Sequence, residues 1–328
     1  MHKLPVGILG GTGYVGRELC ALAATHPALR LVFATARDAG DHEVSVDRRA
    51  LPLVRPDDAA FGDAALIFSA LPHGASAPWV ERARRAGAKV VDLSADFRPG
   101  ASDAPQASAT RHASVPYGLT ELARREVARA ELVANPGCYA TAVLLGLLPL
   151  LTRSLVRSDG TISVAAASGV TGAGHAPRAD LLFGEVAEDM RPYAVDNTHR
   201  HLAEMRSVIG GLGCTADLIF TPHLLPVARG IIATITVPVV SEMATPLALW
   251  KEHYAGETFV EISDEPPRLR DVVRRNVARI TAHRAAGVRR PTLVVLAAID
   301  NLVKGAAGQA LQNGNLLLGL DEALGLPA

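Results

Sequence analysis

A glycine-rich turn near its start decides the fold of this chain: residues 6–16 are Val-Gly-Ile-Leu-Gly-Gly-Thr-Gly-Tyr-Val-Gly. Residues 6–9 predict a short apolar strand, and residues 14–24 predict a helix. Gly11, Gly13 and Gly16 match G-x-G-x-x-G, where glycines let the backbone approach a pyrophosphate and the helix N-terminus attracts its charge. Placed between strand and helix, the motif predicts a dinucleotide site formed by Gly10, Gly11, Thr12, Gly13, Tyr14, Val15 and Gly16.

The second predicted strand, residues 29–35, bears on which dinucleotide binds. It ends in Ala-Thr-Ala-Arg-Asp at 34–38. A carboxylate at this place holds the free 2′-hydroxyl of NAD, whereas a cation suits the 2′-phosphate of NADP. Thr35 and Arg37 therefore favour NADP(H). Asp38 leaves NAD open, because a loop one residue out of register would present its carboxylate instead.

Strands and helices alternate through the rest of the first half. Apolar strands are expected at 64–70 and 89–93, with a basic helix at 79–86 between them, which predicts a Rossmann-type doubly wound parallel sheet. Ligands bind beyond the carboxyl ends of such strands. Candidate contacts there are Pro72, His73 and Gly74 for the cofactor and Arg98 for an anion. A loop histidine without chemistry and a solvated arginine remain the alternatives.

A second turn carries the candidate nucleophile. Residues 134–141 are Ala-Asn-Pro-Gly-Cys-Tyr-Ala-Thr, the end of a strand, a turn and the start of an apolar helix. At a helix N-terminus, free N–H groups and the helix dipole favour a thiolate, so the pKa of Cys138 is expected to be low. The alternative is a small buried cysteine with no chemistry.

Composition excludes several functions. The 328 residues suit two domains. Lys plus Arg equals Asp plus Glu, 33 each, so nothing in the charge favours a nucleic acid or a membrane as partner. The longest apolar run, 142–151, is half a membrane span. Three widely spaced cysteines fit a reduced cytoplasmic protein, and the absence of a signal-like start agrees.

The second half has a different character. Strands are expected at 160–167, 231–240 and 292–299, and residues 268–290 are expected to be basic and irregular. Ser168 opens a small-residue loop, including Gly169 and Gly172, that suits close contact with a bound group. His199-Arg200-His201 lacks a spaced third ligand, so no metal is predicted. Arg200 is the candidate there for binding an anion.

Another dense motif lies at 219–232, where apolar strand flanks His223 and Arg229 and prolines stiffen the expected turn. A histidine held in this way is either structural or a positioned acid-base group. The candidate nucleophile elsewhere in the chain favours the acid-base interpretation.

Taken in order, eight segments resemble the family of N-acetyl-gamma-glutamyl-phosphate reductases, within the aspartate-semialdehyde dehydrogenase-like superfamily. They are residues 10–16, 71–74, 92–98, 135–139, 168–174, 199–201, 221–230 and 300–305.

The resemblance implies NADPH-dependent reduction of an acyl phosphate to an aldehyde through a thioester on Cys138, with His223 as acid-base partner. It implies an α/β fold in which a dinucleotide-binding domain, 1–137 with a helix from 305–328, joins an α+β catalytic and dimerisation domain, 138–304. A homodimer or homotetramer is expected. Candidate contacts are Asn301 and Lys304 near the nicotinamide, and Arg98, Ser168, Gly169, Gly172, Arg200 and Arg229 for the substrate.

Two departures leave the substrate open. Ala140 replaces the family's common proline, and His175 replaces its common basic residue, usually arginine. A carrier-linked aminoadipyl or glutamyl phosphate is the nearest alternative substrate. A non-catalytic NADP-binding sensor is the alternative from another class, although a sensor has no need of both Cys138 and His223.

Overall fold

The computed structural model describes residues 3–37, 43–46, 49–100 and 115–328. Contacts divide the chain into two units, each with its own sheet: the first is 1–137 with 306–327, and the second is 138–305 with Ala328. Asp38 lies outside the described residues, so its part in cofactor choice stays a prediction.

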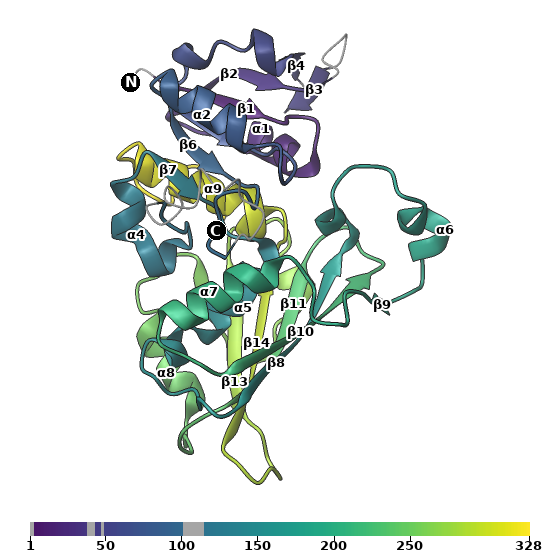
Figure 1. The fold of residues 1–328 in the computed structure, drawn as a ribbon, viewed down its shortest axis with the longest axis vertical. Helices are drawn as coiled ribbons and strands as arrows, with labels where there is room; N and C mark the ends of the chain where they lie inside the picture. The colour runs from purple at the N-terminus through teal and green to yellow at the C-terminus, as the bar shows by residue number, and fades with distance from the viewer. Residues whose placement is uncertain (1–2, 38–42, 47–48, 101–114) are drawn as a thin grey trace. The chain divides into compact units, whose positions relative to one another are not determined.

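The first unit is built on a sheet in the order β3-β4-β2-β1-β5-β6-β7 (Figure 1). Every pair in it is parallel except the β3–β4 hairpin. The predicted Rossmann-type parallel sheet is therefore confirmed. The strands are β1 Leu4–Leu9, β2 Leu29–Thr35, β3 Glu43–Val46, β4 Arg49–Val54, β5 Leu66–Ser69, β6 Lys89–Asp92 and β7 Leu132–Ala134.

Helices α1 Tyr14–Thr25, α2 Ala77–Arg85, α4 Thr120–Ala128 and α9 Gly308–Leu317 belong to this unit. The last of them contributes Ala310, Leu311 and Leu317 to the same apolar core as β1 and β5. Polar contacts fasten it as well: Asn313 donates to the carbonyl of Gly118 at 2.8 Å, and Lys89 Nζ donates to the carbonyl of Leu317 at 3.0 Å. A segment distant in sequence thus completes the unit.

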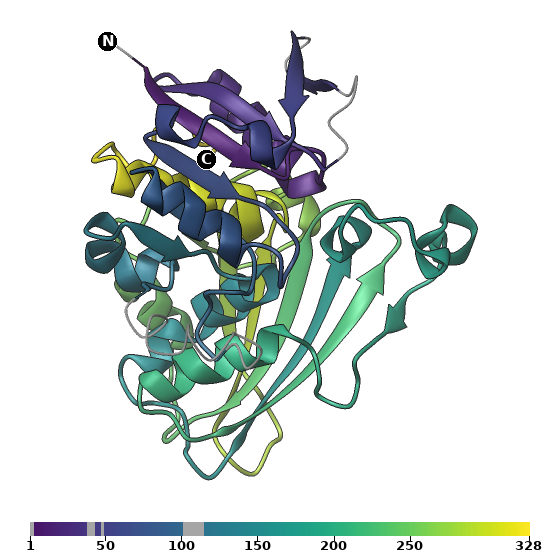
Figure 2. The same cartoon turned by 45° about the horizontal axis from the view of Figure 1, so that its top comes forward.

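The second unit is built on a mixed sheet in the order β12-β13-β14-β11-β8-β10-β9. Its edge strand β9 precedes α7 in sequence, and the short helix α6 lies out beyond that edge (Figure 2). The strands are β8 Thr161–Gly169, β9 Arg191–Pro192, β10 Asp217–Leu225, β11 Ile231–Pro238, β12 Val260–Ile262, β13 Ala278–Arg284 and β14 Thr292–Ile299. The helices are α5 Cys138–Leu151, α6 Phe183–Val186, α7 His201–Gly211 and α8 Pro246–His253.

Helix α5 is the central helix of this unit, and every residue after Cys138 in it is buried. Pro149 has no N–H group, so the carbonyl of Leu145 lacks its usual helical donor. The hydroxyl of Tyr254 donates to that carbonyl instead, and Trp250 Nε1 donates to the carbonyl of Gly146 at 3.0 Å. Side chains at the end of α8 therefore let an apolar helix tolerate an internal proline.

The region expected to be irregular, 268–290, contains a strand, so that prediction is wrong. β13 pairs in register with β14 from Ala278 to Arg284. Ala278, Ile280 and Ala282 are buried, and Arg279 between them lies 3.7 Å from Glu261 in an ion pair. The basic residues hid this period-two pattern, although the partner strand β14 is the next one in sequence.

Candidate active site

Cys138 is the first residue of α5, directly after the turn that follows β7. Its side chain is half-buried. A Cβ on Gly305 would lie only 2.8 Å from the Cβ of Cys138, so glycine is required for the turn 300–305 to approach so closely. In contrast, burial raises the pKa of the Cys20 thiol to about 12, as expected for a cysteine that only packs.

Cys138 opens into a pocket of about 520 Å³ within the second unit. Its size suits a small molecule. The residues around it come from the start of α5, the end of β8, the segment with α6 and β9, the start of α7, and β10. They are Cys138, Tyr139, Ser168, Gly169, Gly172, Ala173, Arg178, Asp180, Leu181, Arg191, Tyr193, His199, Arg200, His201 and Leu224.

The small-residue loop after β8 is held tightly. A Cβ on Gly169 would lie 2.8 Å from the backbone of Ala228, and the N–H of Gly169 donates to the carbonyl of Gly230. Asn301 ties the two segments together, since its Oδ1 accepts from the N–H of Gly230 at 2.8 Å and its Nδ2 donates to Thr171 Oγ1 at 2.9 Å. Ser168, Gly169 and Gly172 line the pocket as a result.

Asn301 and Lys304 were predicted to lie near the nicotinamide. Both are buried in the second unit, and the Asn301 amide holds the loop just described. Lys304 Nζ lies 5.6 Å from the centre of the Phe259 ring. Their contact with cofactor stays a prediction.

His201 and Glu204 form a buried pair at the start of α7. Residues three apart on a helix share a face, and His201 Nε2 lies 3.9 Å from Glu204 Oε1. The side chains are only 4% and 3% exposed, so little solvent screens the pair. His201 lines the Cys138 pocket, so a carboxylate-paired imidazole and a cysteine face one cavity.

His199 packs beside His201 and Tyr139, but its electrostatic environment differs from that of His201. Its ring centroid lies 4.8 Å from that of His201 and 5.4 Å from that of Tyr139, and its Nδ1 accepts the N–H of His201. Burial, with a smaller effect of Arg200, lowers the pKa of His199 to about 4. It is therefore neutral near pH 7.

His223 lies inside β10 rather than in the turn expected for it. Side chains alternate along a strand: Phe220 packs on the Tyr139 ring and Leu224 lines the pocket, so His223 belongs to the other face. Its Nδ1 is 3.3 Å from the carbonyl of Ala166. Of the histidines in the described part of the chain, His199 and His201 line the pocket. The acid-base role predicted for His223 is untested.

Three arginines line the pocket, two of them not foreseen from sequence. Arg178 donates to both carboxylate oxygens of Asp180, at 3.0 and 2.6 Å, and Arg191 contacts the same residue. Arg178 lowers the pKa of that carboxyl. Arg200, the predicted anion-binding residue, is exposed at the pocket edge.

The other two predicted arginines are engaged elsewhere. Arg229 lies 3.4 Å from Asp300 in an ion pair. Arg98 belongs to the first unit, where it is 8% exposed and donates to the carbonyls of Asn135 and Leu93, each at 2.8 Å. Their contact with substrate stays a prediction.

In the first unit, the glycine turn has the geometry that a dinucleotide needs. A Cβ on Gly16 would lie 2.0 Å from the carbonyl oxygen of Gly10, and Gly10 has φ +81°. The buried Thr35 hydroxyl accepts the N–H of Gly10 at 3.2 Å, so it shapes the turn. Arg37 is exposed just after β2. These residues fit NADP(H).

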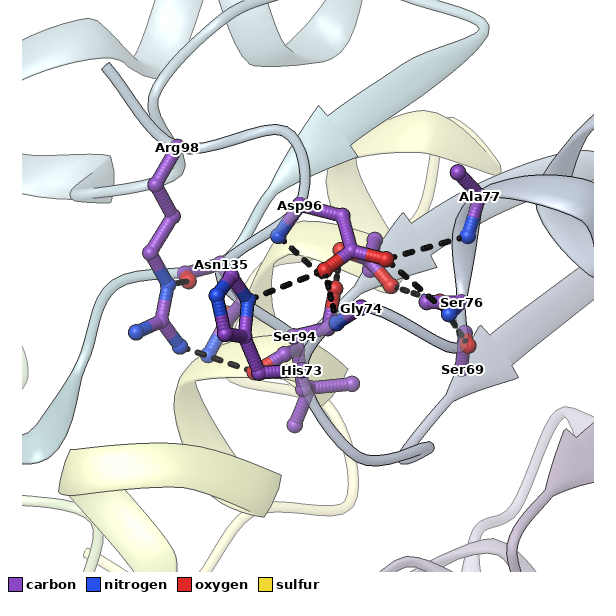
Figure 3. Close-up of polar contacts among 11 residues, drawn as sticks. Ser69, His73, Gly74, Ser76, Ala77, Ser94, Asp96, Arg98 and Asn135 are labelled. Atoms are coloured by element: carbon purple, nitrogen blue, oxygen red, sulfur yellow. Dashed lines mark hydrogen bonds and ion pairs between the residues drawn. The ribbon is translucent and has the colours of Figure 1, made fainter. Parts of the chain in front are cut away.

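Next to this turn, a polar network joins the loops after β5 and β6 (Figure 3). Asp92 is fully buried and accepts from the hydroxyls of Ser76 and Ser94. Burial raises the pKa of this carboxyl to about 6. Asp96 accepts from the loop that holds His73 and Gly74.

No helix within the described ranges is long and apolar enough to cross a membrane. Nor do three or more His, Cys, Asp or Glu side chains among the described residues gather as metal ligands would.

Each of the two units matches a known protein family domain. Residues 138–301 match the family described as semialdehyde dehydrogenase, dimerisation domain, and residues 5–130 match its NAD binding domain. N-acetyl-gamma-glutamyl-phosphate reductase of Azotobacter vinelandii is 40% identical, covering 98% of each chain. The protein of the same name from Pseudomonas paraeruginosa is 41% identical with the same coverage.

Solved structures with low sequence identity share the fold. Aspartate semialdehyde dehydrogenase II of Vibrio cholerae, solved as a complex with ASA, has a TM-score of 0.76 at 18% identity and covers 97% of this chain and 99% of its own. The enzyme from Candida albicans, solved with NADP, has a TM-score of 0.71 at 13% identity, over 96% and 98%. The predicted combination of a Rossmann-type domain with an α+β domain is confirmed.

Proposed function

The chain belongs to the N-acetyl-gamma-glutamyl-phosphate reductases, the NADP-dependent reductases of arginine biosynthesis, and we propose that it performs their reaction with Cys138 as the nucleophile. The reaction reduces N-acetyl-L-glutamyl 5-phosphate to N-acetyl-L-glutamate 5-semialdehyde and releases phosphate. The observation that supports this assignment of the nucleophile is the pocket that Cys138 shares with three arginines and with His201, which is paired with the buried Glu204.

Cys138 divides one difficult reduction into two easier steps. Its thiolate attacks the acyl phosphate, the acyl-oxygen bond breaks, and phosphate leaves a thioester on the sulfur. NADPH, when bound, supplies the hydride that reduces this thioester. The resulting hemithioacetal collapses to the aldehyde and frees the thiolate.

His201 holds and returns the proton in this cycle. As base it takes the thiol proton of Cys138, and as acid it protonates the oxygen of the hemithioacetal; it takes that proton back on collapse. Glu204 orients the ring and stabilises its protonated form at 3.9 Å. His223 remains the alternative from the sequence, although its strand position gives it the opposite face.

The pocket arginines match a substrate that carries both a phosphate and a carboxylate. Arginine binds either anion through two parallel hydrogen bonds. Arg178 and Arg191 share the carboxylate of Asp180, whereas Arg200 has no acidic partner among the described residues. We assign Arg200 to an anionic group of the substrate for that reason.

Residues of the first unit would hold the cofactor: the glycine turn at 10–16 takes the pyrophosphate, and Arg37 takes the 2′-phosphate. We also infer a homodimer or homotetramer, because the family matched by residues 138–301 is described as a dimerisation domain. A cytoplasmic location agrees with three free cysteines. Sedimentation of the purified protein tests the assembly.

The decisive assay runs the reaction in reverse. Wild type and Cys138→Ser are given N-acetylglutamate semialdehyde, phosphate and NADP⁺, and NADPH formation is followed. Wild type should turn over, and the variant should lose at least about 10³-fold while still binding NADPH. Equal turnover of the two proteins would contradict the role of Cys138. If the wild type binds NADPH but reduces only a carrier-linked acyl phosphate, that compound and not the acetylglutamyl phosphate is the substrate.

A further inference from the structure

The loop after β5 borders the glycine turn. β1 and β5 are paired neighbours, with Leu9 opposite Ser69. A Cβ on Gly10 would lie 2.7 Å from the carbonyl oxygen of Ala70, so the two chain segments are in direct contact. Residues 71–77 therefore leave the sheet at the edge where a parallel fold binds its nucleotide.

One carboxylate, that of Asp96, holds this loop (Figure 3). Its Oδ1 accepts the N–H of Gly74 at 2.6 Å, and its Oδ2 accepts those of Ser76 and Ala77 at 3.0 and 3.1 Å. Ala77 begins α2, so the charge also lies at a helix N-terminus, where it is favoured. Asp96 is 8% exposed, and such charge-assisted bonds are strong.

The same carboxylate fixes the imidazole of His73. His73 Nδ1 lies 3.0 Å from Asp96 Oδ1. Since a carboxylate only accepts, Nδ1 carries the hydrogen and Nε2 is left as an acceptor in the neutral ring. The His73 side chain is 40% exposed, whereas that of Asp96 is 7% exposed. The buried carboxylate of Asp96 thus orients the more exposed imidazole of His73.

We propose that Asp96 is a positioning residue for the cofactor: it sets the 73–77 loop and displays Nε2 of His73 to a hydroxyl or amide donor of bound NADP(H). This inference rests on the proposed function, because it assumes that the first unit binds NADP(H). Asp96 itself, behind the loop, touches no cofactor atom.

The test measures NADPH binding directly, by fluorescence titration, on the full chain. Asp96→Asn keeps the shape but loses the charge, and should raise the Kd for NADPH about tenfold. His73→Ala should raise it by a similar factor. The double variant should be no weaker than the poorer single one, because the loss of the Asp96 charge already removes the positioning of His73. Asp57→Asn, which loses only the exposed ion pair to Arg82 of α2, is the control and should bind as wild type does.

A merely structural role for Asp96 gives a different result. Asp96→Asn would then lower the thermal midpoint but leave the Kd for NADPH unchanged, and that outcome overturns the proposal. If Asp96→Asn does not fold, the Kd of His73→Ala for NADPH decides the question by itself. An unchanged Kd in this variant of an exposed residue would also overturn the proposal. A wild type that fails to bind NADPH contradicts the proposed function instead, so the two failures are distinguishable.

Discussion

Two histidine-bearing segments meet at Tyr139. One contacts it through histidine side chains, and the other through the backbone carbonyl of a histidine. The start of α7 presents side chains, since the rings of His199 and His201 lie 5.4 and 6.1 Å from the Tyr139 ring. At His223, β10 instead presents a backbone group, because the Tyr139 hydroxyl donates to the carbonyl of His223. A histidine in a sequence motif can therefore take part in the chemistry only where the secondary structure turns its side chain toward the cavity.

The largest effect that tests this contrast is expected from His201→Asn. Loss of the acid-base group should lower kcat about 10²–10⁴-fold. Binding of NADPH, which belongs to the first unit, should stay at the wild-type value. Steady-state kinetics in the reverse direction, with NADPH titration alongside, measures both. A fall of less than tenfold would remove His201 from the mechanism.

Glu204→Gln is expected to have the next largest effect. The amide keeps the shape of the carboxylate but no longer stabilises a charged imidazole, so kcat should fall about tenfold. The acidic limb of the pH–rate profile should also move to lower pH, which a merely structural role would not produce. An unshifted limb would show that Glu204 acts only in packing.

A smaller, pH-dependent effect is expected at His199. Because its pKa is about 4 in the folded protein, against 6.5 ordinarily, the unfolded chain binds more protons between these values. The wild type should therefore lose stability as the pH falls from 6.5 to 4. His199→Asn should lose less over the same window, as followed by thermal unfolding at several pH values. Parallel curves for the two proteins would contradict the buried neutral state.

The smallest effect is expected at His223. His223→Asn changes a side chain on the face of β10 away from the pocket, and kcat should stay within about threefold of wild type. The reverse assay used for His201→Asn gives the direct comparison. A hundredfold loss here, with His201→Asn nearly unaffected, would reverse the assignment and restore the role predicted from sequence.

Local signals predicted much of the fold. The glycine turn, the start of α1 at Tyr14 and the bounds of β14 followed from residues adjacent in sequence. β13 did not, because its arginines masked the alternation and because the strand is stabilised by β12 and β14 on either side of it. Such a strand is defined by its neighbours more than by its own composition.

The residues of the site likewise divide into those that the sequence could predict and those that it could not. The position of Cys138 at a helix start could be predicted, since strand, turn and helix are consecutive there. The His201–Glu204 spacing of three was visible but needed α7 to begin at His201 to place both on one face. Arg178 and Arg191 gave no motif-like signal, because both act through Asp180, which lies outside the segments singled out from the sequence. Asp96 stands within segment 92–98, but its bonds to the loop after β5 could not be deduced from that segment alone.

The discontinuity of the first unit has a consequence for synthesis on the ribosome. Strands β1 to β7 emerge early, but α9, which supplies part of their core, emerges only after residues 138–305. At about 5–20 residues per second, translation of that stretch takes roughly 8 to 34 seconds. A nascent chain can thus complete the half that bears Cys138 while its nucleotide-binding half still exposes an uncovered sheet, the interval in which a chaperone has most to bind.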